Sequence, residues 1–232
     1  MKSGLLLFVF LTSLICYGQI VNKDIKKTYQ TRYYFETQRM EMFRTLEPNN
    51  DFLPWALSER ADEIPINIWS QQVGICIGLG PHLYLDAGMA WMQNGEAYVY
   101  QDSQSDSSFN YQTHYRYIGL PFEFKSTFGD KIQFYLGTGL APALYNGFKQ
   151  DIQWTNSLGA QYDDKIVINN TLSSFILLWK SSCGLDIHLD DFYNLRLGLI
   201  YRQQLNNSYG PYEHFVHKSK GWGINLGLSK KL

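Results

Sequence analysis

The chain has 232 residues and a formal net charge of −1, and 16% of its residues are aromatic. This length allows one or two domains, and the lack of a basic excess argues against a nucleic-acid partner. The mean hydropathy of −0.26 excludes a bundle of membrane helices, whereas the aromatic excess is typical of β-rich chains with much interfacial surface.

The N-terminus has the features of a cleaved signal peptide, which we place at residues 1–18. Lys2 supplies a positive charge, and residues 5–15 form an apolar run that is followed by a small-x-small pattern at 16–18. The run of about 11 residues is shorter than the ~20 that a membrane-spanning helix needs. We therefore expect an exported chain; lipidation of Cys16 is the alternative, and Ile15 disfavours it.

The segment 19–66 precedes the regular part of the sequence. Its best candidate for a strand is 31–43, although the alternation there is poor and the charge is high. Residues 46–66 would then form a long external loop. The alternative makes 19–66 a periplasmic extension and leaves the closing strand to IPINIWS (64–70) or to a partner chain.

Apolar and polar residues alternate from residue 71 to the end, which predicts seven strands. These cover 71–79, 83–91, 117–125, 132–140, 175–187, 195–202 and 222–228. The connections alternate between short (80–82, 128–131, 190–194) and long (94–110, 147–172, 206–219), and KIVI at 165–168 is β-prone within one long connection.

This rhythm is typical of an all-β, antiparallel up-and-down transmembrane barrel with short periplasmic turns and long extracellular loops, not of a Greek-key sandwich. A barrel with both ends on the periplasmic side has an even number of strands, so we expect eight. The predicted domains are the signal peptide, an N-terminal segment (19–66) and the barrel (67–232).

The two faces of the predicted strands differ in size and polarity. One is rich in Leu, Ile, Phe and Trp, and the other combines Gly with Ser, Asn and isolated charges. A narrow lumen needs small residues to make room for a few long ones, so we expect the apolar face to meet lipid. The predicted lipid-facing residues are Ile118, Leu120, Phe122, Phe124, Leu177, Trp179, Leu197, Leu199, Trp222 and Ile224. In this pattern Pro121 predicts a bulge or a local bend.

Charges of both signs are predicted to point into the lumen: Asp86, Glu123, Lys125, Lys180, Asp186, Arg196 and Arg202. An eight-stranded barrel is just wide enough for side chains, and an unpaired charge inside it would be costly. We therefore expect a paired ionic network that fills the lumen; the alternative is a narrow polar path for ions or a small solute.

Two stretches carry a resemblance to a known family: YIGLPFEFKSTFGDKIQFYLGTGLAPALY and FYNLRLGLIYRQQLNNSY. In the first, a Tyr-x-x-x-Pro strand ends in a basic residue, and a Phe-Gly turn and a Gly-rich strand follow; the matching positions are Tyr117, Pro121, Lys125, Phe128, Gly129, Gly137 and Gly139. From about residue 67 onward the chain resembles the outer-membrane β-barrel proteins of Bacteroidota, including the PorT-like barrels. The resemblance implies the fold, and it leaves the role open because the family hosts many functions. The chain departs from the usual barrel ending, since Leu232 stands where an aromatic residue is common.

The sequence predicts no enzyme, cofactor or metal. Ser182 and His188 would lie ~20 Å apart along one strand, so they cannot form a triad with Asp186. No G-x-S-x-G or H-E-x-x-H motif occurs, and His214 and His217 lack a third ligand. Cys76 and Cys183 are expected to face opposite sides of distant strands and to form no disulfide.

Aromatic residues gather near the long connections: Tyr98, Tyr100, Tyr111, Tyr115, Trp154, Tyr162, Tyr209 and Tyr212. Such residues anchor barrels at headgroup depth or form contact surfaces for partners. We therefore expect a non-enzymatic outer-membrane barrel of a Gram-negative bacterium. Its partners would be outer-membrane lipid and a protein at the loops or the periplasmic side, and its role structural, adhesive or accessory to secretion. The alternatives are a narrow channel, a lipid-handling barrel, or a soluble periplasmic barrel with its apolar face inward.

Overall fold

The computed structural model describes residues 31–48, 63–102, 104–168, 175–208 and 215–232. The predicted signal peptide, most of the predicted loop at 46–66, Tyr209, Tyr212 and His214 lie outside these ranges. No helix among the described residues is long and apolar enough to cross a membrane.

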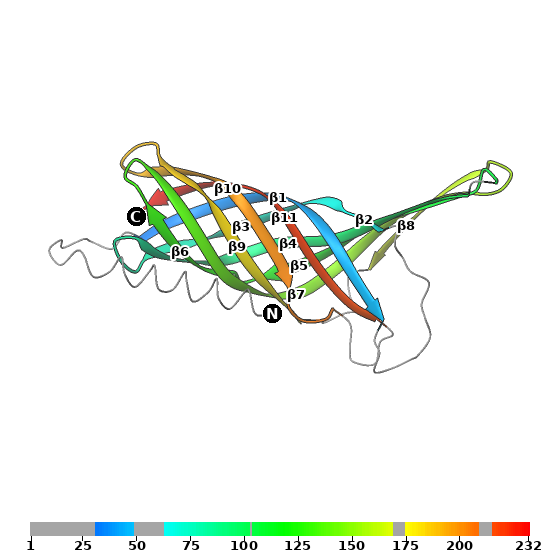
Figure 1. The fold of residues 1–232 in the computed structure, drawn as a ribbon, viewed down its shortest axis with the longest axis horizontal. Coiled ribbons are helices and arrows are strands. Elements are labelled where there is room, and N and C mark those ends of the chain that lie inside the picture. Colours follow the sequence, from blue (N-terminus) through cyan, green and yellow to red (C-terminus); the bar gives the residue numbers. More distant parts are fainter. Residues whose placement is uncertain (1–30, 49–62, 103, 169–174, 209–214) are drawn as a thin grey trace.

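The described chain is built from antiparallel strands (Figure 1). In chain order they are β1 (Thr31–Pro48), β2 (Glu63–Ile64), β3 (Ile66–Gly78), β4 (Leu83–Gln101), β5 (Ser108–Gly119), β6 (Phe122–Phe128), β7 (Ile132–Thr155), β8 (Gln161–Ile168), β9 (Phe175–His188), β10 (Tyr193–Gln204) and β11 (Phe215–Lys231).

Eight strand positions close into a barrel. β5 and β6 follow one another between β4 and β7 and form one interrupted strand. The ring then runs β1, β3, β4, β5/β6, β7, β9, β10 and β11, and β1 closes it by pairing with both β3 and β11. The predicted fold class and strand number are confirmed.

The N-terminal part of the barrel differs from the predicted division of the chain. The candidate strand at 31–43 lies within β1, so the barrel starts before the predicted boundary at residue 67. IPINIWS does not close the barrel by itself, because residues 66–70 are the first part of β3. No partner chain is needed for closure.

Two of the predicted long loops are strands instead. β4 continues to Gln101 and β5 begins at Ser108, so only residues 102–107 connect them. β7 runs to Thr155 and is joined by β8, which contains the β-prone KIVI stretch. We call the outer parts of β4 (97–101), β5 (108–115) and β7 (148–155), together with β8, the arm; in Figure 1 it projects to the right of the barrel.

Pro121 interrupts a strand without shifting its register. Gly119 pairs with Ala143 and Phe122 with Leu140, so residue numbers keep the same sum on both sides of the break. Of the two alternatives predicted at Pro121, the bulge is therefore wrong; the strand is interrupted there between β5 and β6. The register shift occurs between Tyr115 and Tyr117, and the extra residue lies on β7. There Gly147 has a φ of 115°, which favours glycine and suits a bulge.

Candidate functional site

The outer wall of the barrel is apolar, as the alternation predicts. Nine of the ten residues predicted to face lipid are exposed on it, and Leu177 is half-buried. A lipid-facing wall of this kind around a polar interior is the architecture of a transmembrane β-barrel. The alternative of a soluble barrel with its apolar face inward does not fit this arrangement.

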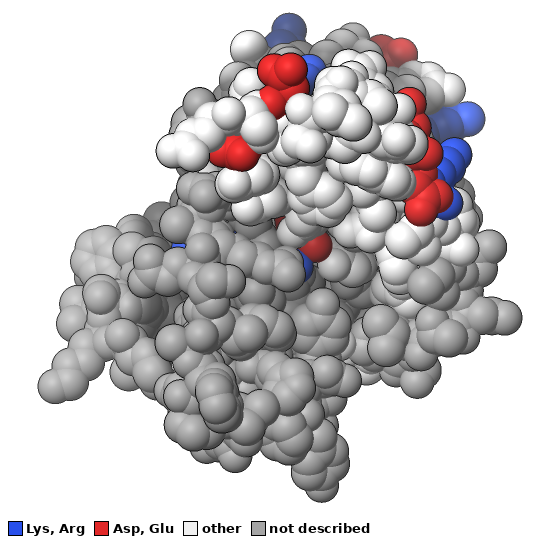
Figure 2. Space-filling view, turned by 90° about the vertical axis from the view of Figure 1, so that its right-hand side faces the viewer, with Lys and Arg blue, Asp and Glu red and all other residues white. Residues whose placement is uncertain are grey.

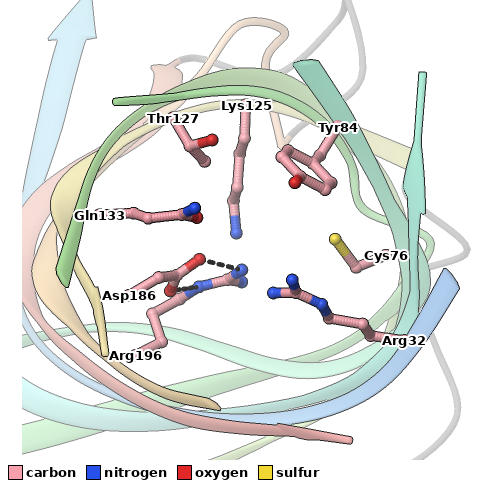
Figure 3. A pocket seen from close by; sticks show the side chains of 8 residues that line it. All are labelled: Arg32, Cys76, Tyr84, Lys125, Thr127, Gln133, Asp186 and Arg196. Carbon is pink, nitrogen blue, oxygen red and sulfur yellow. Dashed lines mark hydrogen bonds and ion pairs between the residues drawn. The ribbon is translucent and has the colours of Figure 1, made fainter. Parts of the chain in front are cut away.

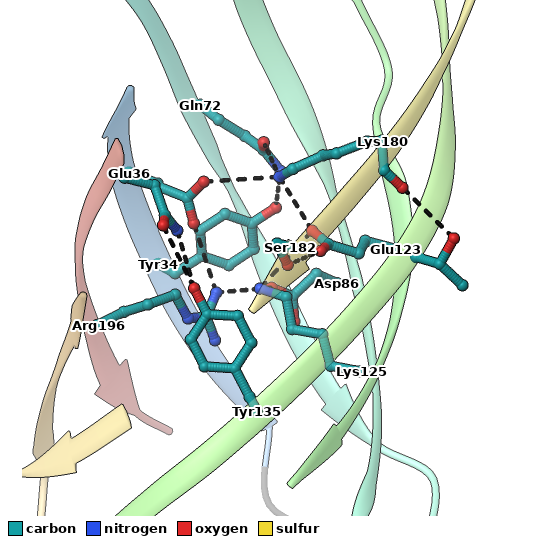
Figure 4. Close-up of polar contacts among 12 residues, drawn as sticks. Tyr34, Glu36, Gln72, Asp86, Glu123, Lys125, Tyr135, Lys180, Ser182 and Arg196 are labelled. Atoms are coloured by element: carbon teal, nitrogen blue, oxygen red, sulfur yellow. Dashed lines mark hydrogen bonds and ion pairs between the residues drawn. The ribbon is translucent and has the colours of Figure 1, made fainter. Parts of the chain in front are cut away.

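All seven charges predicted to face the lumen lie inside the barrel, and none is more than 7% exposed. Six of them, from β4, β6, β9 and β10, meet in one cluster. Figure 4 labels all of these except Asp186, which Figure 3 shows beside Arg196. We call this cluster, together with Glu36 of β1, the ionic network. Arg202 lies apart from it.

Each buried carboxylate of the ionic network contacts at least one buried cation. Asp86 Oδ2 accepts from Lys125 Nζ at 2.6 Å and from Arg196 Nη1 at 2.9 Å. Arg196 Nε also donates to Asp186 Oδ1 at 2.8 Å, and Lys180 Nζ lies 2.9 Å from Glu123 Oε2. Mutual pairing offsets the cost of removing these charges from water.

Glu36 is the member of the ionic network that the sequence analysis missed. Its carboxylate lies 3.5 Å from Lys180 Nζ and 3.6 Å from Arg196 Nη1. Alternate residues of β1, starting at Arg32, are buried. The same alternation is present in the sequence, but outward charges such as Arg39 and Glu41 obscure it.

Tyrosines surround the cations of the ionic network. Lys125 Nζ and the guanidinium carbon of Arg196 each lie 5.3 Å from the ring centroid of Tyr135, within the range of cation–π attraction. The Tyr135 hydroxyl also accepts from Asn225 Nδ2 at 3.1 Å. The network is thereby held from several strands.

Lumen glycines make room for this cluster. A Cβ on Gly137 would lie 2.3 Å from Glu123 Oε1, and one on Gly198 would lie 2.1 Å from the Tyr135 hydroxyl. These glycines have ordinary backbone angles, so their function is to leave space. This agrees with the small-residue reasoning used to orient the faces.

Apolar side chains also fill the lumen, which the sequence analysis did not predict. One cluster contains Ala90, Met92, Tyr117, Ala141, Ala143, Ile176 and Leu178, and the other Met40, Met42, Ile66, Ile68 and Ile200. They lie on the inward face of their strands. The interior is therefore packed with both ionic and apolar layers.

Little space remains beside the ionic network. One cavity of about 10 Å³, lined by Arg32, Cys76, Lys125 and Asp186 among others, lies inside the barrel (Figure 3). This volume is near the minimum that holds a single water. A much wider hollow of about 1150 Å³ lies at the end with the short turns, among residues such as Pro81, Lys131 and Asp190.

The residues considered for hydrolytic chemistry have other partners. Ser182 Oγ donates to Glu123, and Asp186 is held by Arg196. His188 Nδ1 lies 2.8 Å from Asn194 Oδ1. The three side chains thus form no relay.

The cysteines and the possible metal ligands do not come together either. Cys76 and Cys183 are free thiols on opposite faces of the wall. In the described part of the chain, no group of three His, Cys, Asp or Glu side chains is placed to hold a metal. The side chain of His217 is outside the described set.

The arm has two unlike faces. Tyr98 pairs with Tyr111, and Trp154 pairs with both Phe109 and Tyr162, so these rings share one face. The Tyr98 and Tyr111 rings stack at 5.6 Å, and those of Trp154 and Tyr162 at 5.3 Å. The other face carries polar residues: Gln112, His114, Lys149, Asp151, Gln153, Asp163 and Lys165. Figure 2 looks onto this end of the molecule and shows charged groups separated by uncharged surface.

No protein-family model matches the sequence, and no curated protein matches it. The family resemblance noted above therefore stays a prediction. Among solved structures, the chain is similar to the outer membrane protein OprG from Pseudomonas aeruginosa, with 10% identity and a TM-score of 0.45 over 90% of this chain and 99% of that one.

The chain is also similar to two further solved structures. Neisserial surface protein A matches at 9% identity and a TM-score of 0.41, over 86% of this chain and 97% of that one. The N-terminal β-barrel domain of Pseudomonas aeruginosa OprF matches at 13% identity and a TM-score of 0.38, over 88% of this chain and all of that one (100%). At such identities and TM-scores these likenesses carry no argument about this chain, and its barrel architecture follows from its own strand pairing.

Proposed function

We propose that this protein is an integral outer-membrane barrel of a Gram-negative bacterium that does not conduct and has no enzymatic activity. It serves as a structural, adhesion or secretion-accessory component through its external surface. The observation that carries the proposal is the filled lumen, in which an ionic network and two apolar clusters occupy the interior.

A filled lumen argues against the channel alternative. A conducting pore needs a continuous wet path, and its charges must exchange ions. Here Asp86, Glu123 and Lys180 are at most 5% exposed and bind one another or neighbouring charges. Moving an ion past them would require breaking several buried pairs.

The arm favours a role in contact. It places exposed aromatic residues such as Tyr100, Phe109, Trp154 and Tyr162 on an ordered sheet outside the barrel. Aromatic side chains are enriched at recognition surfaces, because they provide large contact area at low entropic cost. A rigid sheet needs little ordering when a partner binds.

The proposal is tested with an arm-deleted variant in which Asn-Gly replaces residues 98–111 and a second Asn-Gly replaces 151–165. Ala97 pairs with Gln112 and Gln150 with Ile166, so a two-residue turn fits each junction. We expect the intact protein and the arm-deleted variant to fractionate with outer membranes, to change gel mobility only after boiling, and to give no conductance in planar bilayers.

The intact protein should capture a surface or secretion partner from the outer-membrane fraction, and the arm-deleted variant should not. Step-like conductance of the intact protein would favour the channel alternative instead. A protein that washes off the membrane without a boiling-dependent shift would overturn the membrane assignment. Equal capture by both forms would overturn the role of the arm.

A further inference from the structure

Arg202 has no described carboxylate as a partner, whereas the buried cations Lys125, Lys180 and Arg196 each contact at least one. It is 2% exposed and lies on β10. Its hydrogen-bond acceptors are all uncharged: Ser70 Oγ at 3.4 Å, the Gln93 carbonyl at 2.5 Å and Asn94 Oδ1 at 3.3 Å. The guanidinium therefore has contacts but no compensating charge.

Two N–H groups at this place have no acceptor. Arg202 Nε and Asn94 Nδ2 are both buried without a hydrogen-bond partner. The two residues already touch, since Arg202 Nη2 donates to Asn94 Oδ1. Two unsatisfied donors thus lie beside one uncompensated positive charge. A negatively charged acceptor would satisfy the donors and balance the charge.

The neighbouring ion pairs occupy the other buried carboxylates. Glu96 pairs with Arg44 at 2.8 Å, and Glu36, Asp86, Glu123 and Asp186 each contact a cation of the ionic network. Among the described residues, the guanidinium of Arg202 therefore has no carboxylate to balance its charge.

The surroundings make this charge expensive. Arg202 crosses the lumen from β10 to β4, which is four positions away in the ring of eight. Met42, 3.8 Å from Nη2, belongs to an apolar cluster, and so does Met92 on the same face as Asn94. An uncompensated ion among apolar groups is strongly unfavourable, and a guanidinium does not lose its proton under ordinary conditions.

We propose that Arg202 and Asn94 form a binding site for one small inorganic monoanion of the chloride type. Arg202 Nε and Asn94 Nδ2 donate to the anion, and its charge neutralises the guanidinium. Water would satisfy the hydrogen bonds but would leave the charge uncompensated. A single excess charge in an enclosed, partly apolar site selects a small monovalent ion over a large organic one, and the neighbouring thioethers can adapt to it.

The test uses the full mature chain, folded in detergent micelles, with sodium chloride or sodium gluconate at equal ionic strength. Binding is read from broadening of the chlorine NMR line and from the urea concentration at half-unfolding. A ligand that binds only the folded state lowers the unfolding constant by about 100-fold when present at 100 times its Kd. We therefore expect chloride, and not gluconate, to raise the half-unfolding concentration.

Two variants remove the site in opposite ways. Arg202→Met deletes the charge, and Asn94→Asp places a carboxylate beside it at nearly unchanged size. Both should lose the line broadening and the chloride dependence, and Asn94→Asp should be the more stable protein in gluconate. The exposed cation Lys220 supplies the control: Lys220→Gln should keep both signals.

The proposal fails if wild-type protein responds equally to chloride and gluconate and shows no line broadening beyond that of protein-free micelles. It also fails if Asn94→Asp folds and retains the full chloride response. If Arg202→Met does not fold, as its gel mobility will show, the wild-type and Asn94→Asp measurements still decide the matter. None of these outcomes depends on the role of the arm.

Discussion

Replacing Lys180 by methionine should destabilise the barrel far more than the loss of an ordinary ion pair. Lys180 is 5% exposed, and its ammonium lies 2.9 Å from Glu123 Oε2 and 3.5 Å from Glu36 Oε1. It also donates to Gln72 Oε1 at 3.3 Å. Methionine preserves much of the volume and removes the charge, so two buried carboxylates lose a shared cation.

The expected cost is about 3–5 kcal/mol, the range found when one partner of a buried pair is removed. Adding Glu123→Gln restores neutrality, and the double variant should recover a part of that loss. The coupling between the two substitutions should therefore be about 1–3 kcal/mol, because residues that share one network are not additive. Urea unfolding in micelles, followed by tryptophan fluorescence and by gel mobility, measures all four proteins.

The arm provides a matched control in the Lys149–Asp151 pair, whose side chains are 30% and 41% exposed. Lys149→Met should cost at most about 1 kcal/mol, as surface pairs do. If Lys180→Met costs no more than Lys149→Met, the lumen charges are solvated, and the reasoning from a filled interior is refuted. Strict additivity of Lys180→Met and Glu123→Gln would likewise refute the shared network.

Two further predictions test the wall and the tip of the arm. A Cβ on Gly139 would lie 1.9 Å from the Phe122 carbonyl oxygen, whereas one on Gly80 meets nothing closer than 3.8 Å. Gly139→Ala should therefore cost about 1–3 kcal/mol or more in the same urea assay, and a cost no larger than that of Gly80→Ala would contradict the close strand contact. At the tip, hydrogen bonds from Ser105 and a backbone N–H lower the pKa of the Asp102 carboxyl. Because the pKa is lowered in the folded turn, the ionised carboxylate stabilises that turn at pH values above the ordinary carboxyl range. This stabilisation is lost as the pH falls through the lowered pKa, so the Ser105 amide signals should shift at acidic pH in the wild type. The same shift in Asp102→Asn would contradict this assignment.

Alternation and the composition of the two faces were together enough to orient most of the wall. The parity of residues around Glu123 and Lys125 placed them inside, and the Gly-rich character of that face resolved which side was the lumen. Pairing partners could not be predicted, because contacts such as Lys180 with Glu36 cross the lumen between strands far apart in the sequence. Their geometry depends on the shear and tilt of the closed barrel, which no local pattern reports.

Three features escaped the sequence analysis for physical reasons. The arm strands lie beyond the apolar belt, so they lack the lipid-facing stripe by which the other strands were found. The inward apolar residues Met40 and Ile68 have polar outward neighbours such as Arg39 and Asn67, so the polarity of the two faces is locally the reverse of the pattern used to orient the wall. The bulge near Gly147 reflects a mismatch between paired strands, and a single strand gives no sign of it.

The continuity of β7 from wall to arm has a mechanical consequence. Its 24 residues span about 80 Å at ~3.3 Å per residue, while a strand needs only about 9–11 residues to cross a bilayer. The turn at 156–160 therefore lies at the end of a long strand that is hydrogen-bonded to its neighbours along its length. This pairing fixes the distance and the angle of the turn relative to the barrel. A load applied at that turn would pass straight into the barrel wall, so a tag inserted there would report the tilt of the whole barrel in the membrane.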